Sequence, residues 1–239
     1  MSEESCLFTN SLLAALPPAK YESLLSHLEY IPLKLGHILY DTGEPVTQVY
    51  FPNQAMISLI SVMKNNVSAE IGLVGNEGMI GLTALFGSNY SNNRSVVQIP
   101  GSAMRIDAQL LKHEFNKGEE LQKLLLLYIQ ARLYQTSQIA VCNSRHTVEE
   151  KLARWLLSVQ DCVSKSSLPL KQKFIAQMLG VRRASITEAA IALQKAEIIR
   201  YSRGQITILN TKQLELNACE CYGLITAEFT RLLNIGKNL

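Results

Sequence analysis

The chain has 239 residues, of which 47% are hydrophobic, enough to bury the core of one large domain or two small ones. Its formal net charge is only +3, so affinity for nucleic acid has to come from a local basic patch. No apolar run is long enough to span a membrane, and the first residues lack the basic segment of a secretion signal. The odd number of cysteines, five, favours reduced thiols and a cytoplasmic protein.

The first half of the chain predicts short helices followed by many short strands. Leucines at helical spacing over residues 12–28 are interrupted at Pro17 and Pro18. From Tyr30 to Ile106 short alternating runs are separated by Gly, Pro and Asn, including the pair Asn65 and Asn66. The predicted strands are residues 49–51, 57–61, 69–73, 96–99 and 103–106. This pattern is typical of a β-sandwich or β-roll.

One long helix is predicted over residues 121–143. Two neighbouring faces are apolar, and their members recur at steps of three and four. The first face is Leu126, Ile129, Leu133, Thr136 and Ala140, and the second is Leu121, Leu125 and Tyr128. So much apolar surface after a completed β-domain suits packing against a second copy of the chain. A helix packed wholly on its own domain is the alternative.

A break is predicted at residues 143–146, which we interpret as an interdomain hinge. Thr147–Glu150 has the capping-box pattern that starts a helix, and this helix should run through Val159 into a serine-rich loop over residues 161–168. A C-terminal helix pair is predicted over residues 214–233, interrupted near Gly223. The expected domains are therefore 1–120, the helix 121–143, and 144–239.

Residues 170–208 predict a helix-turn-helix followed by a two-stranded wing. The first helix has an apolar face, Gly180 allows a sharp turn, and Val181 would fill the corner between the helices. The second helix has its own inner face of Ile186, Ala189, Ala190 and Leu193. The wing strands, residues 198–201 and 205–208, flank a hairpin turn at residues 202–204.

The second helix begins where a recognition helix meets base edges in the major groove. Arg183 suits a bidentate contact with guanine, and Arg182, Ser185 and Thr187 suit phosphate or base contacts. Arg203 at the wing tip and Lys171 before the first helix add positive charge. Residues 170–208 hold seven basic and two acidic residues, a net charge of +5, as phosphate binding favours. An ordinary helical hairpin with a basic face is the alternative.

A β-rich domain, a long helix, a hinge and a winged helix-turn-helix together resemble the CRP/FNR family of bacterial transcription regulators. The resemblance implies an α+β fold: an N-terminal β-roll or jelly-roll sensor domain, a long dimerisation helix, and a C-terminal winged helix-turn-helix domain. It also implies a homodimer on a two-fold symmetric double-stranded DNA operator, with RNA polymerase as a further partner. Ala184 and Glu188 fall at its base-contacting positions, where the best-known members carry glutamate and arginine, so the operator should differ.

The same resemblance implies an effector site in the β-roll. Cyclic-nucleotide-binding members hold the ribose with a glycine-glutamate pair, for which this chain has Gly78 and Met79. Arg94 and Ser95 match the phosphate-binding pair, and Thr136 and Ser137 match the purine-contacting positions. A cyclic nucleotide is therefore one effector to test. Alternatively, Arg94 forms a structural ion pair, Thr136 lies in a dimer interface, and the ligand differs or is absent.

The cysteines give no strong signal. Cys6 alone cannot hold an iron–sulfur cluster. Cys142 and His146 have a ligand spacing if their helix continues, but a buried thiol and a hinge histidine is the simpler interpretation. Cys219 and Cys221 should point to different sides of a helix, and no neighbour in the sequence lowers a thiol pKa. We therefore predict no metal site.

We find no catalytic residues and predict that the chain is not an enzyme. The competing hypothesis to a DNA-binding regulator is a small-ligand sensor module that acts through protein contacts without recognising an operator. It predicts tight small-molecule binding with weak, salt-dependent DNA affinity.

Overall fold

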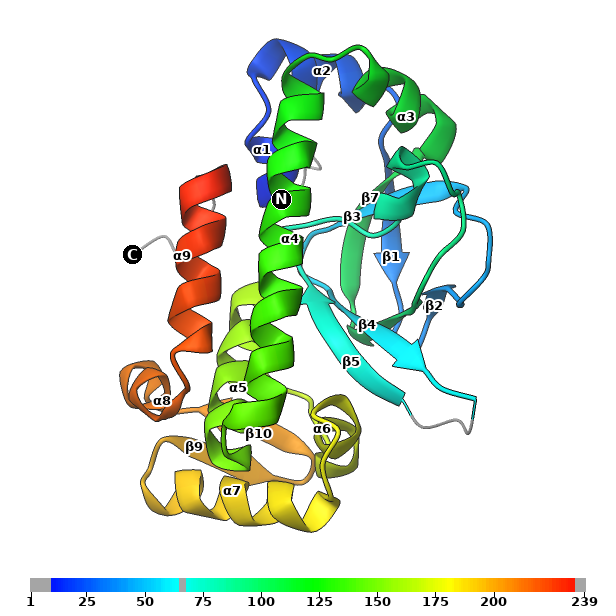
Figure 1. Ribbon diagram of the computed structural model, residues 1–239. Helices are drawn as coiled ribbons and strands as arrows, with labels where there is room; N and C mark the ends of the chain where they lie inside the picture. Colours follow the sequence, from blue (N-terminus) through cyan, green and yellow to red (C-terminus); the bar gives the residue numbers. More distant parts are fainter. Residues whose placement is uncertain (1–9, 65–67, 235–239) are drawn as a thin grey trace.

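The computed structural model describes residues 10–64 and 68–234. A β-rich domain lies on one side of a long helix, α4, and a smaller helical domain lies beyond the end of that helix (Figure 1). The predicted turn at Asn65 and Asn66 and the thiol of Cys6 fall outside the described residues. In the part of the chain that is described, no helix is both long and apolar enough to cross a membrane.

The β-domain begins with α1 (Ser11–Ala14) and α2 (Pro18–Leu25), divided at the two prolines as predicted. Its seven strands are β1 (Glu29–Leu33), β2 (Ile38–Tyr40), β3 (Gln48–Pro52), β4 (Met56–Val62), β5 (Ser68–Val74), β6 (Arg94–Ile99) and β7 (Gly101–Asp107). They form two antiparallel sheets, ordered β1-β7-β3 and β2-β6-β4-β5. All five predicted strands are confirmed, while β1 and β2 were not predicted individually.

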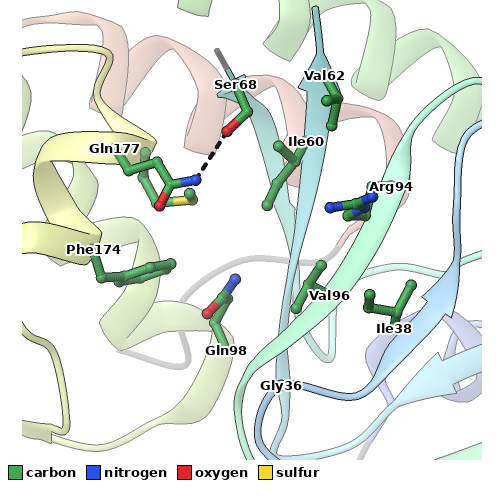
Figure 2. A pocket seen from close by; sticks show the side chains of 11 residues that line it. Gly36, Ile38, Ile60, Val62, Ser68, Arg94, Val96, Gln98, Phe174 and Gln177 are labelled. Carbon is green, nitrogen blue, oxygen red and sulfur yellow. Dashed lines mark hydrogen bonds between the residues drawn. The ribbon is translucent and has the colours of Figure 1, made fainter. Parts of the chain in front are cut away.

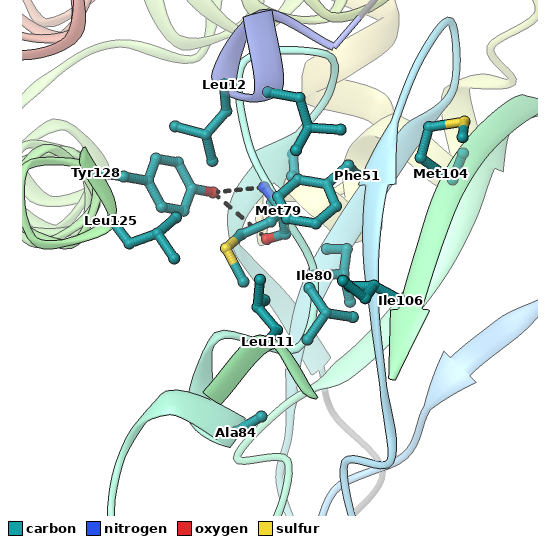
Figure 3. Packing of buried hydrophobic residues seen from close by; sticks show 14 of the residues in the cluster. Leu12, Phe51, Met79, Ile80, Ala84, Met104, Ile106, Leu111, Leu125 and Tyr128 are labelled. Atoms are coloured by element: carbon teal, nitrogen blue, oxygen red, sulfur yellow. Dashed lines mark hydrogen bonds between the residues drawn. The ribbon is translucent and has the colours of Figure 1, made fainter. Parts of the chain in front are cut away.

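The β-domain core lies between these sheets, the N-terminal helices and one face of α4. A 3₁₀ turn, η2 (Leu82–Leu85), and helix α3 (Ala108–Asn116) cover its edge. Phe51, Met79 and Ile106 meet Leu125 and Tyr128 of α4 in this core (Figure 3). The face of α4 that carries Leu121, Leu125 and Tyr128 is therefore used within the chain.

Helix α4 (Glu120–Arg145) has 26 residues and is longer than predicted. The prediction of a hinge that starts at Asn143 was wrong, because the helix continues through Arg145 and the backbone turns at His146. The next helix, α5 (Val148–Val163), starts with the predicted capping box at Thr147 and Glu150. It also runs past Val159, so the predicted serine-rich loop starts only after Val163.

The second domain contains α6 (Gln172–Met178), α7 (Arg183–Lys195) and a small sheet of β8 (Ser167–Leu168), β9 (Ile199–Ser202) and β10 (Gln205–Ile208). The wing therefore has three strands in the order β8-β10-β9, not two, because Leu168 pairs with Ile206.

The chain ends with α8 (Thr211–Asn217) and α9 (Cys221–Leu233). The prediction that this pair breaks near Gly223 was wrong, because Gly223 lies inside α9 and the break falls at residues 218–220. Helix α9 returns along α4 (Figure 1) and places Phe229 and Leu233 in the β-domain core.

A buried carboxyl group joins the two domains. Glu70 on β5 accepts hydrogen bonds from the Ser58 hydroxyl at 2.7 Å and the Trp155 indole N–H of α5 at 2.8 Å. Burial raises the pKa of Glu70 to about 7, against the opposing effect of these hydrogen bonds and of Arg154 and Arg132. A polar link of this kind fixes the orientation of α5 on the sheet.

Candidate nucleic-acid interface

The turn between α6 and α7 has the hydrogen bonds of a Schellman motif. Gly180 has φ of +64°, which glycine adopts without a Cβ clash. The Val181 N–H donates to the Ala176 carbonyl at 3.0 Å, and the Gly180 N–H donates to the Gln177 carbonyl at 3.3 Å. Val181 packs against the core between the helices, as predicted.

Helix α7 places its N-terminal residues at the surface. Arg182, Arg183, Ala184 and Glu188 are exposed, and Ser185 is half-buried. Ile186, Ala189, Ala190 and Leu193 on the opposite face are buried. The exposed end of α7 is therefore free to enter a groove of DNA.

Thr187 faces α6 more than solvent. Its hydroxyl lies 2.9 Å from Gln172 Oε1 and 3.1 Å from the carbonyl oxygen of Arg183. Because a hydroxyl donates one hydrogen bond, the Thr187 hydroxyl binds either Gln172 of α6 or the Arg183 carbonyl one turn earlier in α7. This geometry fits a residue that holds α7 on α6.

The wing tip lies beside the start of α6. Arg203 and Gly204 have φ of +50° and +81°, the two positive values that a type I′ hairpin turn requires. A Cβ atom at Gly204 would lie 3.4 Å from Lys171 Cγ. The two basic residues predicted to contact the DNA backbone, Lys171 and Arg203, thus belong to one surface.

Helix α6 packs against the β-domain on its other side. The Gln177 amide donates to the Ser68 hydroxyl at 2.9 Å, and Phe174 and Gln177 face β4 and β6 across a cavity of about 450 Å³ (Figure 2). The helix-turn-helix therefore contacts the β-domain through α6, and α7 faces away from the β-domain.

Residues 150–216 match the family described as the Crp-like helix-turn-helix domain. The second domain is therefore a Crp-like helix-turn-helix domain. This match and the solved structures described next confirm the predicted fold class.

The full chain is similar, at low sequence identity, to the following proteins. It is 20% identical over 184 residues to the global nitrogen regulator of Synechococcus elongatus, covering 73% of this chain and 83% of that protein. The structure of FixK2 from Bradyrhizobium japonicum matches with a TM-score of 0.69 at 15% identity, over 80% of this chain and 98% of FixK2. The c-di-GMP-responsive regulator CLP of Xanthomonas campestris matches with a TM-score of 0.65 at 15% identity, over 80% and 99%.

The first pair of predicted effector residues is packed against α4. The Tyr128 hydroxyl accepts a hydrogen bond from the Met79 N–H at 3.1 Å and lies 3.4 Å from the Met79 carbonyl oxygen (Figure 3). A Cβ atom at Gly78 would collide with that hydroxyl. In this chain Gly78 allows the close approach of Tyr128, and Met79 fills the core with 2% exposure.

The other predicted effector residues also have partners within the chain. Arg94 forms a two-point ion pair with Asp41, with nitrogen–oxygen distances of 3.1 and 2.6 Å, while Ser95 on the same strand is buried. Thr136 and Ser137 donate to carbonyls one turn earlier in α4. Arg94 lines the cavity beside α6, so its charge faces the domain boundary.

The structure also corrects an interpretation of the cysteines. Cys219 and Cys221 do not point to different sides, because Cys219 lies in the turn before α9 and both sulfur atoms approach Cys142 and His146. The hydrogen bond from Cys219 lowers the pKa of the Cys142 thiol, whereas the hydrogen bond with Cys142 raises the pKa of Cys219 and burial raises the pKa of Cys221. Only the Cys142 and His146 spacing hinted at this cluster in the sequence.

Proposed function

We propose that this protein is a homodimer that pairs through α4 and reads a two-fold symmetric operator with α7. The main observation that supports this proposal is an exposed apolar face on α4. Leu126, Leu133 and Val141 are 50%, 67% and 51% exposed, although they lie on a helix that buries Leu121, Leu125 and Tyr128 in the β-domain core. Apolar positions about seven residues apart suit a parallel or antiparallel helix pair.

Substitution of Leu133 tests the dimer. Leu133→Lys places a charge in the centre of the proposed interface, and we expect a monomer by analytical ultracentrifugation, with loss of tight operator binding. Leu216 on α8 is also exposed, at 77%, so Leu216→Lys is the matched control and should remain dimeric. A Leu133→Lys protein that stays dimeric would place the interface elsewhere.

We further propose that Arg183, Ala184 and Glu188 face base edges, and that Arg182 and Ser185 lie beside them. Lys171 and Arg203 would contact phosphates. Selection of DNA from a random pool should yield an inverted repeat. On that operator Arg183→Ala should cost about 1–3 kcal/mol of binding free energy and reduce sequence specificity at one base pair per half-site. Lys171→Ala should weaken binding to all DNA sequences to the same extent. No enrichment of any sequence would favour the sensor-module hypothesis.

The β-roll is proposed to have lost the nucleotide-binding arrangement of the family. Two contacts support this: Tyr128 fills the space beside Gly78 and Met79, and Asp41 neutralises Arg94. Thermal melts with cyclic AMP, cyclic GMP and c-di-GMP should therefore show no shift. A ligand at a hundred times its Kd would stabilise the protein by about 2.7 kcal/mol, so a shift that disappears in Arg94→Ala would refute the proposal.

A further inference from the structure

Three thiols and one imidazole converge at the end of α4. Cys142 lies in the last turn of α4 and His146 directly follows this helix, while Cys219 lies in the turn that joins α8 to α9 and Cys221 is the first residue of α9. One ligand atom from each of the four lies within 4.8 Å of the other three. The three cysteines are buried, and the His146 side chain is 14% exposed.

Two of the distances between these atoms are close to the edge lengths of a metal-centred tetrahedron. Around a zinc ion with Zn–S of about 2.3 Å and Zn–N of about 2.0 Å, two sulfurs lie about 3.8 Å apart, and sulfur and nitrogen lie about 3.6 Å apart. The Cys142 and Cys219 sulfurs are 3.5 Å apart, and the Cys221 sulfur is 3.7 Å from His146 Nδ1.

The imidazole is oriented as a metal ligand would be. His146 turns Nδ1 toward the thiols, while its Nε2 lies 3.2 Å from a carboxylate oxygen of Glu220. A ligating histidine commonly donates its other ring N–H to a carboxylate, which fixes the tautomer and the ring plane. Glu220 lies between Cys219 and Cys221 in the sequence. Residues 219–221 therefore supply two thiolates and the carboxylate that orients His146.

The charge around the four side chains also suits a bound divalent metal ion. Three thiolates and a neutral imidazole on a divalent ion carry a net charge of −1, after the thiols release their protons. Arg154 of α5 is buried at 4% exposure, acts electrostatically on Cys142 and Cys219, and has no hydrogen-bond partner for Nε among the described residues. A buried guanidinium needs a nearby negative group, and the metal-bound thiolates would provide one.

We propose that Cys142, His146, Cys219 and Cys221 bind one zinc-class divalent cation in a closed tetrahedral Cys₃His site. Nitrogen and sulfur ligands select zinc over magnesium or calcium. Four protein ligands leave no open position, so the ion is structural. It joins the turn at His146 to the segment that leads out of the DNA-binding domain.

The test uses the full-length protein purified under reducing, anaerobic conditions. Elemental analysis should find about one zinc per chain. After zinc removal, cobalt(II) should give the intense visible bands of a tetrahedral site together with thiolate-to-cobalt charge transfer. Cys219→Ser and His146→Gln should lose zinc, whereas Cys162→Ala, which removes a buried thiol outside the cluster, should retain it.

The cobalt spectrum of the wild-type protein is independent of how the variants fold. Glu220→Gln should keep the spectrum but weaken cobalt affinity by about 10–100-fold in a chelator competition. Reduced wild-type protein without zinc or tetrahedral cobalt bands would overturn the proposal. Zinc retained in Cys219→Ser, or iron with acid-labile sulfide in the wild-type protein, would overturn it as well.

Discussion

The buried carboxyl of Glu70 should make the stability of this protein fall as pH rises. Burial between β5 and α5 raises its pKa from 4.5 to about 7, so the folded protein holds a proton that the unfolded chain releases. The stabilising effect is fully present below pH 4.5 and is lost as pH rises through 7. Glu70→Gln keeps an acceptor for Trp155 and cannot ionise.

The size of the effect follows from the two pKa values. They differ by about 2.5, and one pKa unit corresponds to about 1.36 kcal/mol. Between pH 5 and pH 8, ionisation of Glu70 should lower the free energy of unfolding of the wild-type protein by about 2.5 kcal/mol. For a chain of this length that corresponds to about 5–10 °C in Tm.

Thermal melts at pH 5 and pH 8, at one fixed protein concentration, measure this change in Tm. The Tm of Glu70→Gln minus that of the wild type should increase by about 5–10 °C from pH 5 to pH 8. Glu22→Gln makes the same chemical change at an exposed position of α2 and should show no such increase. A Glu70→Gln difference that is equal at both pH values would refute the assignment of this proton to Glu70.

Three further substitutions test contacts in the two domains. Tyr128→Phe leaves the buried Met79 N–H without its partner and should cost about 1–3 kcal/mol in urea unfolding. Thr147→Ala removes the cap of α5 and should cost about 0.5–2 kcal/mol, whereas Thr147→Ser should be close to wild type. Gly75→Ala places a methyl group 2.6 Å from the Cys162 backbone, and the overpacking should cost about 1–3 kcal/mol and increase proteolysis of the native protein.

Different results would contradict these three contacts. Unchanged stability in Tyr128→Phe would mean that water reaches Met79. Equal losses in the alanine and serine variants of Thr147 would mean that the hydroxyl cap does not stabilise α5. A fully stable Gly75→Ala protein would show that β5 and α5 are not in contact there.

The parts of the structure that depend on neighbours in sequence could be predicted. Gly180 and Val181 specify the turn between α6 and α7 through local hydrogen bonds, and Thr147 and Glu150 specify the start of α5. Strands β3 to β7 of the β-domain followed from short alternating apolar runs between turn residues. Each of these signals lies within a few residues of the feature that it predicts.

Contacts between distant segments could not be predicted in this way. Cys142 and Cys219 are 77 positions apart, and Tyr128 and Met79 are 49 apart. The return of α9 along α4 creates the first contact, and the packing of α4 on the sheets creates the second. Ser167 and Leu168 also form a strand only because β10 is available to pair with them.

The return of α9 determines how the DNA-binding domain can move. The chain enters this domain at His146, leaves it through the turn at Cys219, and is anchored to the β-domain core on both sides, by α4 before it and by Phe229 and Leu233 after it. A domain attached at one end can swivel in any direction, whereas one attached at two points can rotate only about the line that joins them. Because the sulfur atoms of Cys142 and Cys219 are 3.5 Å apart, the two attachments nearly coincide at the end of α4. Any rotation of the domain about this point would first have to break the contacts of Trp155 with Glu70 and of Gln177 with Ser68.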